Sequence, residues 1–189
     1  MSKIKKRVIA LFAAFILAAG AAMAAPASSD QTDYDARLAK QVRKELVTLP
    51  YYGVFDNLAF EISGETVVLA GQVTRPSTRK DAERRVAKIE GVERVVNNIQ
   101  VLPVSPNDDR IRARTYRAVF RSSSLYRYAR GANPSIHIVV NRGHVTLEGV
   151  VSNKMDSQLA YMAANGVPGV FSVTNNLRVE GAAEDIRRA

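Results

Sequence analysis

An internal repeat constrains the fold of this chain more than any other feature of its sequence. The segment Gly91–Val101 recurs 78 residues later as Gly169–Val179, with six of its eleven positions identical. The segment Val67–Val73 recurs at the same offset as Val145–Val151. Self-similarity at a fixed offset indicates one structural unit used twice. The 189 residues therefore contain two units of about 70 residues each, near the lower size limit for a core that folds unaided.

Each unit carries the periodicities of two helices and three strands. In the first unit, a helical apolar stripe covers 35–49 and ends at Pro50. Alternating apolar residues in 58–62 and 67–73 predict a hairpin, and a second helix over 76–90 precedes a strand over 91–101. The hairpin makes its two strands antiparallel, whereas the helical crossover makes the second and third strands parallel.

The predicted fold class is therefore α+β, with tandem αββαβ units. Each unit is a three-stranded mixed sheet with two helices on one face. We expect a first domain over 35–103, a proline-containing linker over 104–107 and a second domain over 108–181. The second copy has five extra residues between its first helix and first strand, around 126–131.

Four glycines have predicted structural roles. Gly91 and Gly169 follow helix-like runs, where the left-handed position at a helix C-terminus favours glycine. Gly71 and Gly149 share the inward parity of apolar strands, which predicts a helix crossing close to the backbone.

The N-terminal segment has the pattern of a secretory signal peptide over 1–24. Basic residues within 3–7 precede an apolar run over 8–22, and Ala22-Met23-Ala24 is an A-x-A cleavage site. We expect cleavage before Ala25 and a mature protein in a bacterial periplasm. Residues 25–34 are predicted to be a flexible spacer and 182–189 a charged tail.

Little in the sequence favours an enzyme. The absence of cysteine excludes disulfides, thiolate metal sites and a lipidated cysteine. His137 and His144 are interpreted as surface histidines, one on the outward parity of a strand and one at a turn. Asp108 and Asp109 suit the N-terminus of a helix. We therefore predict no catalytic residue, no metal site and no cofactor.

A basic helix at the start of the second unit is the candidate binding surface. Residues 107–181 hold ten Lys and Arg against five Asp and Glu. On a helical wheel one stripe is formed by Arg110, Arg114, Arg117 and Arg121. Tyr116 and Phe120, one turn apart, are predicted to point away from the core. Arginines beside outward aromatics suit an anionic phospholipid interface.

Two alternatives to a lipid surface remain open. Tyr116 and Phe120 could instead pack against the first unit and leave the arginines merely solvated. A basic patch also suits nucleic acid, but an exported chain has little opportunity to meet it, so no nucleic-acid partner is expected.

The repeated motifs resemble those of the BON domain family. Val-x-Leu-x-Gly-x-Val occurs at 67–73 and 145–151, and Gly-Val-x-x-Val-x-Asn-Asn-x-x-Val at 91–101 and 169–179. The resemblance covers about 35–101 and 108–179. It implies a non-enzymatic envelope protein without a cofactor, linked to osmotic stress, phospholipid interfaces and outer-membrane integrity, with peripheral membrane association. The implied partners are an anionic phospholipid or outer-membrane surface, and envelope proteins as well.

A periplasmic protein-binding or chaperone-like module, with a groove or sheet edge for peptides, is the alternative function.

Overall fold

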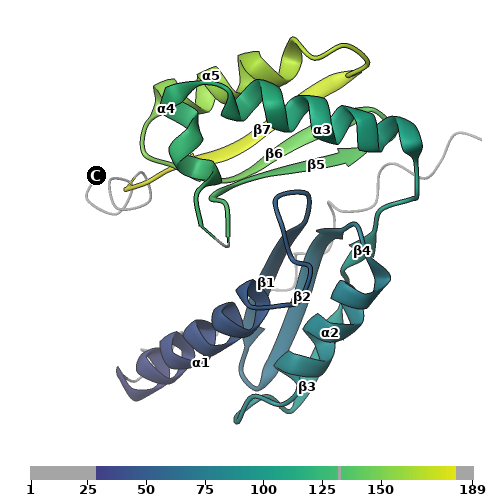
Figure 1. The fold of residues 1–189 in the computed structure, drawn as a ribbon. Helices are drawn as coiled ribbons and strands as arrows, with labels where there is room; N and C mark the ends of the chain where they lie inside the picture. The colour runs from purple at the N-terminus through teal and green to yellow at the C-terminus, as the bar shows by residue number, and fades with distance from the viewer. Residues whose placement is uncertain (1–28, 132, 182–189) are drawn as a thin grey trace, which may run out of the picture.

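The computed structural model describes residues 29–131 and 133–181 of the chain (Figure 1). The predicted signal peptide and the charged tail lie outside the described residues. The first helix, α1 (Ser29–Val47), begins six residues earlier than the sequence pattern predicted. It therefore includes residues 29–34, which we had expected to form part of a spacer.

The first domain is the predicted αββαβ unit. After α1 come β1 (Asn57–Ser63), β2 (Thr66–Val73), α2 (Pro76–Val86), β3 (Arg94–Asn97) and β4 (Gln100–Val101). β1 pairs with β2 antiparallel, whereas β3 and β4 both pair with β2 in parallel. The single third strand predicted from the repeat is thus interrupted at Asn98 and Ile99. Both helices pack on the face of the sheet that carries the buried side chains of Val67, Leu69 and Val73.

The second domain repeats this order with one addition. It contains α3 (Pro106–Phe120), α4 (Ser123–Tyr126), η1 (Arg127–Ala129), β5 (Ile136–Asn141), β6 (His144–Val151), α5 (Lys154–Asn165) and β7 (Ser172–Val179). The sheet order is β5-β6-β7, with β6 antiparallel to β5 and parallel to β7. The predicted α+β class and mixed sheets are confirmed. The extra residues form α4 and η1, which place Leu125 and Tyr128 in the core.

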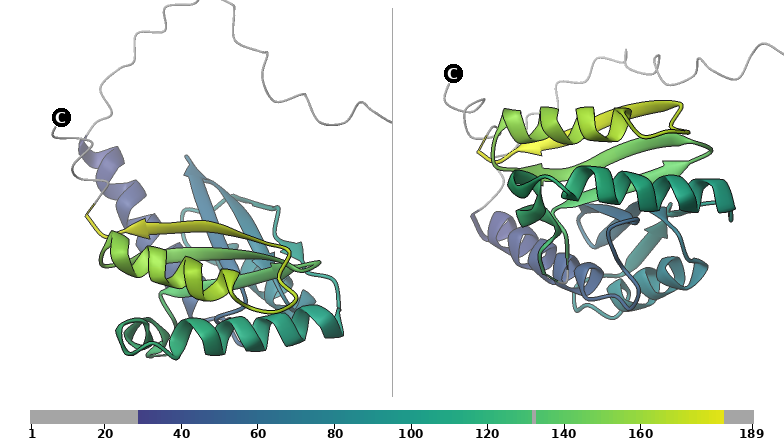
Figure 2. Two further views of the ribbon diagram at one scale, coloured as in Figure 1. Left: turned by 90° about the horizontal axis from the view of Figure 1, so that it is seen from above. Right: turned by 45° about the horizontal axis from the view of Figure 1, so that its top comes forward.

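The helices of the second domain cover one face of its sheet. In Figure 1, α3 and α5 lie above the sheet and the first domain lies below it. The two further views in Figure 2 show the same two helices side by side in one layer. The outer surfaces of α3 and α5 therefore face away from most of the first domain.

Gly91 and Gly169 both adopt positive φ, +87° and +94° respectively. However, α2 ends at Val86 and α5 at Asn165, so these glycines do not cap the helices directly as predicted. Each is the third residue of a tight turn closed by a backbone bond, from Val92 N to Ile89 O (3.1 Å) and from Val170 N to Val167 O (3.2 Å). A positive φ at the third residue, with Glu90 and Pro168 at the second residue not in the positive-φ region, corresponds to a type II turn, which favours glycine.

Gly71 and Gly149 are required for a reason different from the one we predicted. Their φ angles are +118° and +123°. A Cβ atom on Gly149 would lie 2.0 Å from the carbonyl oxygen of Ser135, and one on Gly71 would lie 2.1 Å from that of Asn57. The close neighbour is thus the backbone of the adjoining strand segment and not a crossing helix.

Candidate functional site

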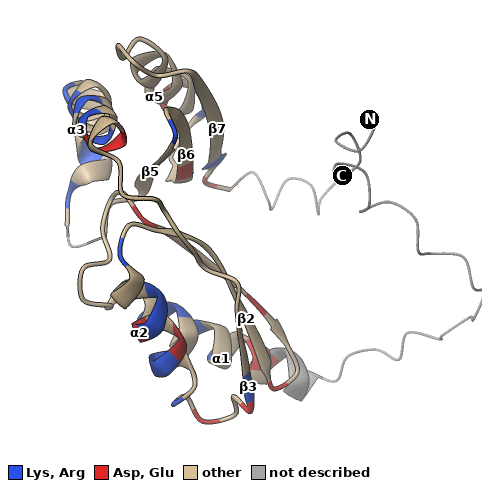
Figure 3. Cartoon of the chain, turned by 90° about the vertical axis from the view of Figure 1, so that its right-hand side faces the viewer, with Lys and Arg blue, Asp and Glu red and all other residues tan. Residues whose placement is uncertain are grey.

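Three of the predicted arginines, Arg110, Arg114 and Arg117, lie on the surface of α3, and Arg121 is its C-cap residue. Arg110, Arg114, Arg117 and Arg121 are all exposed. Arg114 Nη1 donates to Pro168 O (3.4 Å) and Arg117 Nε donates to Ala113 O (3.0 Å). Among the described residues, no ion pair involves any of the four. Their positive charge is consequently not neutralised by a neighbouring carboxylate, and Figure 3 shows Lys and Arg along this helix.

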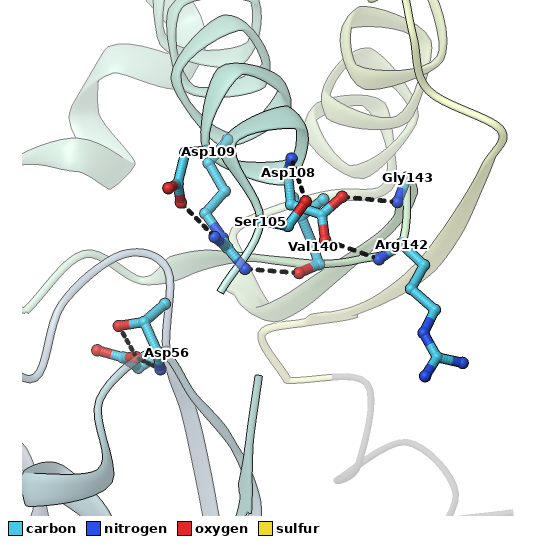
Figure 4. Close-up of polar contacts among 9 residues, drawn as sticks. Asp56, Ser105, Asp108, Asp109, Val140, Arg142 and Gly143 are labelled. Carbon is cyan, nitrogen blue, oxygen red and sulfur yellow. Dashed lines mark hydrogen bonds and ion pairs between the residues drawn. The ribbon is translucent and has the colours of Figure 1, made fainter. Parts of the chain in front are cut away.

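Asp108 fixes the start of α3 to the hairpin of the second sheet (Figure 4). Its buried carboxylate accepts bonds from the backbone N–H groups of Arg142 and Gly143, both at 2.9 Å. Its own N–H donates to Ser105 Oγ (3.2 Å), the N-cap of the helix. The sequence-based interpretation of Asp108 as a helix-terminal charge missed this tertiary role.

Arg112 makes a second attachment between α3 and the sheet. Its buried guanidinium donates from Nη2 to Val140 O (2.8 Å) and pairs through Nη1 with Asp109 (2.5 Å). With Asp108, this bond holds the N-terminal half of α3 against β5 and the β5–β6 turn. The exposed arginines are therefore carried on a helix of fixed orientation.

The predicted outward orientation of Phe120 is wrong. Phe120 is only 6% exposed and belongs to the core of the second domain. Tyr116 is 37% exposed, and its ring makes edge contacts with Phe120 (centroids 4.9 Å apart) and with Phe55 of the first domain (6.2 Å). The alternative, in which both aromatics pack against the first unit, holds for Tyr116 through its contact with Phe55, whereas Phe120 packs inside the second domain. This packing leaves Phe120 unable to insert into a membrane without leaving the core.

The two domains contact each other through residues 51–56, which we call the strap. Val54 O accepts a bond from Ile138 N (2.7 Å), so the strap adds a backbone contact to the edge strand β5. Val54 and Phe55 pack against the core of the second domain, whereas Tyr52 packs against that of the first. The strap therefore contributes side chains to both cores.

Asp56 holds the strap in its conformation. It is buried and accepts bonds from Gly53 N (3.1 Å) and from the backbone N (2.6 Å) and Oγ1 (2.9 Å) of Thr74. Burial also raises the pKa of the nearby Tyr52 phenol to about 12. These groups serve the contact between the domains.

His137 is buried between the domains, which corrects the prediction of a surface histidine. Its Nδ1 lies 3.2 Å from Gly53 O, and its ring lies 5.4 Å from that of Tyr52. The side chain does point to the outer face of the sheet, as its parity requires, but the strap covers that face. Burial lowers the pKa of His137, while the Gly53 carbonyl and the carboxylates of Asp56 and Glu148 act in the opposite direction.

This burial predicts a pH dependence of stability. Because the folded-state pKa of His137 lies below the ordinary 6.5, the unfolded chain binds the proton more readily, and stability falls as pH drops below 6.5. The midpoint of urea unfolding should be lower at about pH 5.5 than at about pH 7.5, and His137→Gln should reduce the difference. Asp156, whose pKa lies below its ordinary 3.8, loses its stabilising effect only at more acid pH.

His144→Gln, at an exposed position of β6, is the control for this experiment. It should retain the pH dependence of the wild type. An unchanged pH dependence in His137→Gln would contradict the assignment.

Asp156 joins the added segment to α5. Its carboxylate accepts bonds from Arg127, Tyr128 and Asn153. The hydrogen bond from Tyr128, followed by that from Arg127, lowers the pKa of this carboxyl group. All three donors are structural neighbours that fix α4, η1 and the N-terminus of α5 together, so Asp156 has a structural role here.

A hollow of about 420 Å³ lies between α1 and α2 in the first domain. It is open, and six of its seven lining residues have polar or charged side chains; the lining consists of Gln41, Lys44, Glu45, Arg85, Lys88, Ile89 and Glu90. Small-molecule sites are usually more enclosed and more apolar. Within residues 29–131 and 133–181, no group of three or more metal-ligating side chains is present and no helix is long and apolar enough to cross a membrane.

Two αββαβ domains, joined by a strap and carrying an unneutralised arginine surface, define a duplicated small α+β protein. Comparison with family models assigns each half: the BON domain model matches residues 34–103 and 107–181. The chain therefore belongs to the BON domain family. BON domains are generally non-catalytic, are often periplasmic or envelope-associated, and bind phospholipid.

Two solved structures of CdsD, a structural protein of the type III secretion system of Chlamydia trachomatis, show weak similarity. The first is 11% identical with a TM-score of 0.31, and the match covers 80% of this chain and 97% of the chain in that structure. The second, the C-terminal domain of CdsD, is 10% identical with a TM-score of 0.27, covering 75% and 96%. No curated protein matches the sequence.

Proposed function

We propose that this protein is an exported, non-catalytic envelope protein that associates peripherally with anionic phospholipid surfaces. The carrying observation is the exposed stripe of Arg110, Arg114, Arg117 and Arg121 on α3, which has no acidic partner among the described residues. Its role is to support envelope integrity and tolerance of osmotic stress. Export rests on the sequence pattern of residues 1–24, and the periplasm is the proposed location.

The physical basis of binding is attraction between guanidinium groups and lipid phosphates. Each basic residue near an anionic surface contributes about 1 kcal/mol, and the attraction is screened by salt. Guanidinium groups also donate two parallel bonds to phosphate oxygens. The attachment of α3 through Asp108 and Arg112 keeps the arginines on one side of the molecule, so that they can meet a flat surface together.

Replacing Arg114, Arg117 and Arg121 by Ser should reduce binding to anionic vesicles by about a hundredfold at low salt, because about 3 kcal/mol of attraction is lost. The variant should also lose most of the salt dependence of binding. Co-sedimentation with vesicles of phosphatidylglycerol and phosphatidylethanolamine, at several salt concentrations, measures both effects. The substituted side chains are exposed, so the fold should be retained.

The first domain offers a matched control on α1. Arg37, Lys40 and Lys44 are exposed and have the same spacing along their helix as Arg114, Arg117 and Arg121. Their replacement by Ser removes the same charge and should change binding much less. Equal losses in the two folded variants would show that net charge, and not the α3 surface, governs binding.

The alternative function, a peptide-binding or chaperone-like module, is favoured by one observation. β7 is an edge strand, since the sheet order is β5-β6-β7, and most of its residues are exposed. An edge strand can accept an extended peptide through backbone bonds. A wild-type protein that ignores anionic vesicles at low salt would contradict the lipid proposal and favour this alternative.

A further inference from the structure

One strip of the outer face of α5 is apolar although it is open to solvent, beside the exposed polar residues Lys154, Gln158 and Asn165. Met155 and Met162 are 63% and 57% exposed, and Leu159 between them is half-buried. The three residues are spaced i, i+4 and i+7 and so form one stripe. Asp156, Ala160 and Ala164 on the opposite side of the helix are buried. The only acidic residue of α5 is thus turned inward, and the outer face carries no negative charge.

The corresponding helix of the first domain shows that the fold does not require this apolar stripe. At the 78-residue offset of the repeat, Met155, Leu159 and Met162 correspond to Ser77, Asp81 and Arg84 of α2.

The buried positions of the two helices correspond equally well. Ala82 and Val86 of α2 are fully buried, as are Ala160 and Ala164 of α5. The two copies therefore share an apolar inner face and differ in the outer one. In Figure 3, α2 carries blue and red segments, whereas α5 is mostly tan.

The apolar stripe lies beside the arginines of α3. α3 and α5 contact each other in one layer over the sheet. Arg114 bonds Pro168 O just beyond the end of α5, and Arg127, beyond the end of α3, pairs with Asp156 at the start of α5. The helices therefore run in opposite directions, with a cationic outer surface on α3 and an exposed apolar stripe on α5.

We propose that Met155, Leu159 and Met162 of α5 form the apolar element that enters an anionic phospholipid surface beside the α3 arginines. This inference rests on the proposed function and gives to α5 the apolar contact with lipid that the sequence analysis had assigned to Tyr116 and Phe120. A cationic surface beside flexible apolar side chains is complementary to a lipid interface, where phosphates lie next to acyl chains. Methionine adapts its shape at low cost, which suits a fluid surface.

The absence of tryptophan from the sequence permits a direct test of insertion. In Met162→Trp the introduced indole is the sole tryptophan emitter, and Arg84→Trp places the same probe at the matched position of α2. Both variants are mixed with phosphatidylglycerol and phosphatidylethanolamine vesicles, with and without brominated acyl chains, and co-sedimentation is measured in parallel. Met162→Trp should shift to shorter wavelength and be quenched by bromine, whereas Arg84→Trp should do neither.

A second variant tests the contribution of the stripe to affinity. Met155→Ser combined with Met162→Ser should weaken binding about tenfold while leaving its salt dependence unchanged, because only apolar contact is removed. Circular dichroism confirms that this variant is folded.

The outcomes separate the inference from the proposed function. If the wild type co-sediments but Met162→Trp is neither shifted nor quenched, α5 does not insert and the inference is overturned, while lipid binding stands. If the folded double Ser variant binds as well as the wild type, the inference is likewise overturned. If the wild type does not co-sediment at low salt, the proposed function fails and the inference fails with it.

Discussion

Gly149→Val is expected to lower the free energy of unfolding of the second domain by about 4 kcal/mol, through backbone strain and a steric clash together. The φ of Gly149 is +123°, which a β-branched residue adopts only under strain. Its Cβ atom would also lie 2.0 Å from Ser135 O, a backbone atom that cannot turn aside as a side chain can. Thermal unfolding of the purified variant, followed by circular dichroism, measures the loss.

Gly131→Ala separates the two causes. Gly131 also has a positive φ, +89°, but a Cβ atom there would meet nothing within 4 Å. This variant should lose only about 1–2 kcal/mol, which is the cost of the left-handed conformation alone. If Gly149→Val lost no more stability than Gly131→Ala, the close approach of Ser135 O to Gly149 would not contribute to the effect.

Asp108→Ala is expected to cost about 3 kcal/mol, because it leaves two backbone N–H groups of the β5–β6 turn without their acceptor. Asp108 is 1% exposed, and Gly143, whose N–H it accepts, is itself buried. Water cannot easily replace the lost carboxylate there. Urea unfolding of the full chain gives the change in stability.

Asp108→Asn and Asn107→Ala are the comparisons for this prediction. Asparagine keeps one acceptor oxygen, so the loss should be roughly half as large. Asn107 is exposed in the same first turn of α3, and its replacement should change stability by less than about 0.5 kcal/mol. Equal effects of Asp108→Ala and Asn107→Ala would show that the turn does not depend on Asp108.

The repeat made the fold predictable because it marks residues whose burial depends only on the helix or strand that contains them. The parity of Val67, Leu69 and Val73 identifies the buried face of a strand, and the same residues form the core of the first domain. The break between β3 and β4 was not predictable, because the alternating pattern continues through Asn98 and Ile99 although the pairing with β2 does not.

Only the solvent-exposed residues of the candidate site could be predicted from the sequence. The arginine stripe follows from helical spacing alone. His137 was misplaced because it lies on the outer face of the sheet, which a single domain would leave open but which the strap covers. Phe120 was misplaced because it belongs to the core of the second domain itself. Residues 51–56 have no helical or strand periodicity, so nothing in them signalled a contact with the second domain. The exposed stripe of α5 could have been found by comparing Met155 and Met162 with Ser77 and Arg84 across the repeat.

The strap also makes the two domains behave as a tethered heterodimer. Tyr52 packs against the core of its own domain, whereas Val54 and Phe55, from the same short segment, pack against the core of the second domain. The linker between β4 and α3 keeps the two surfaces at a high effective concentration, so their association is intramolecular. An isolated second domain would expose Val139 and His137, which are buried in the pair. The second unit therefore relies on a segment of the first to cover part of its core and the outer face of its sheet.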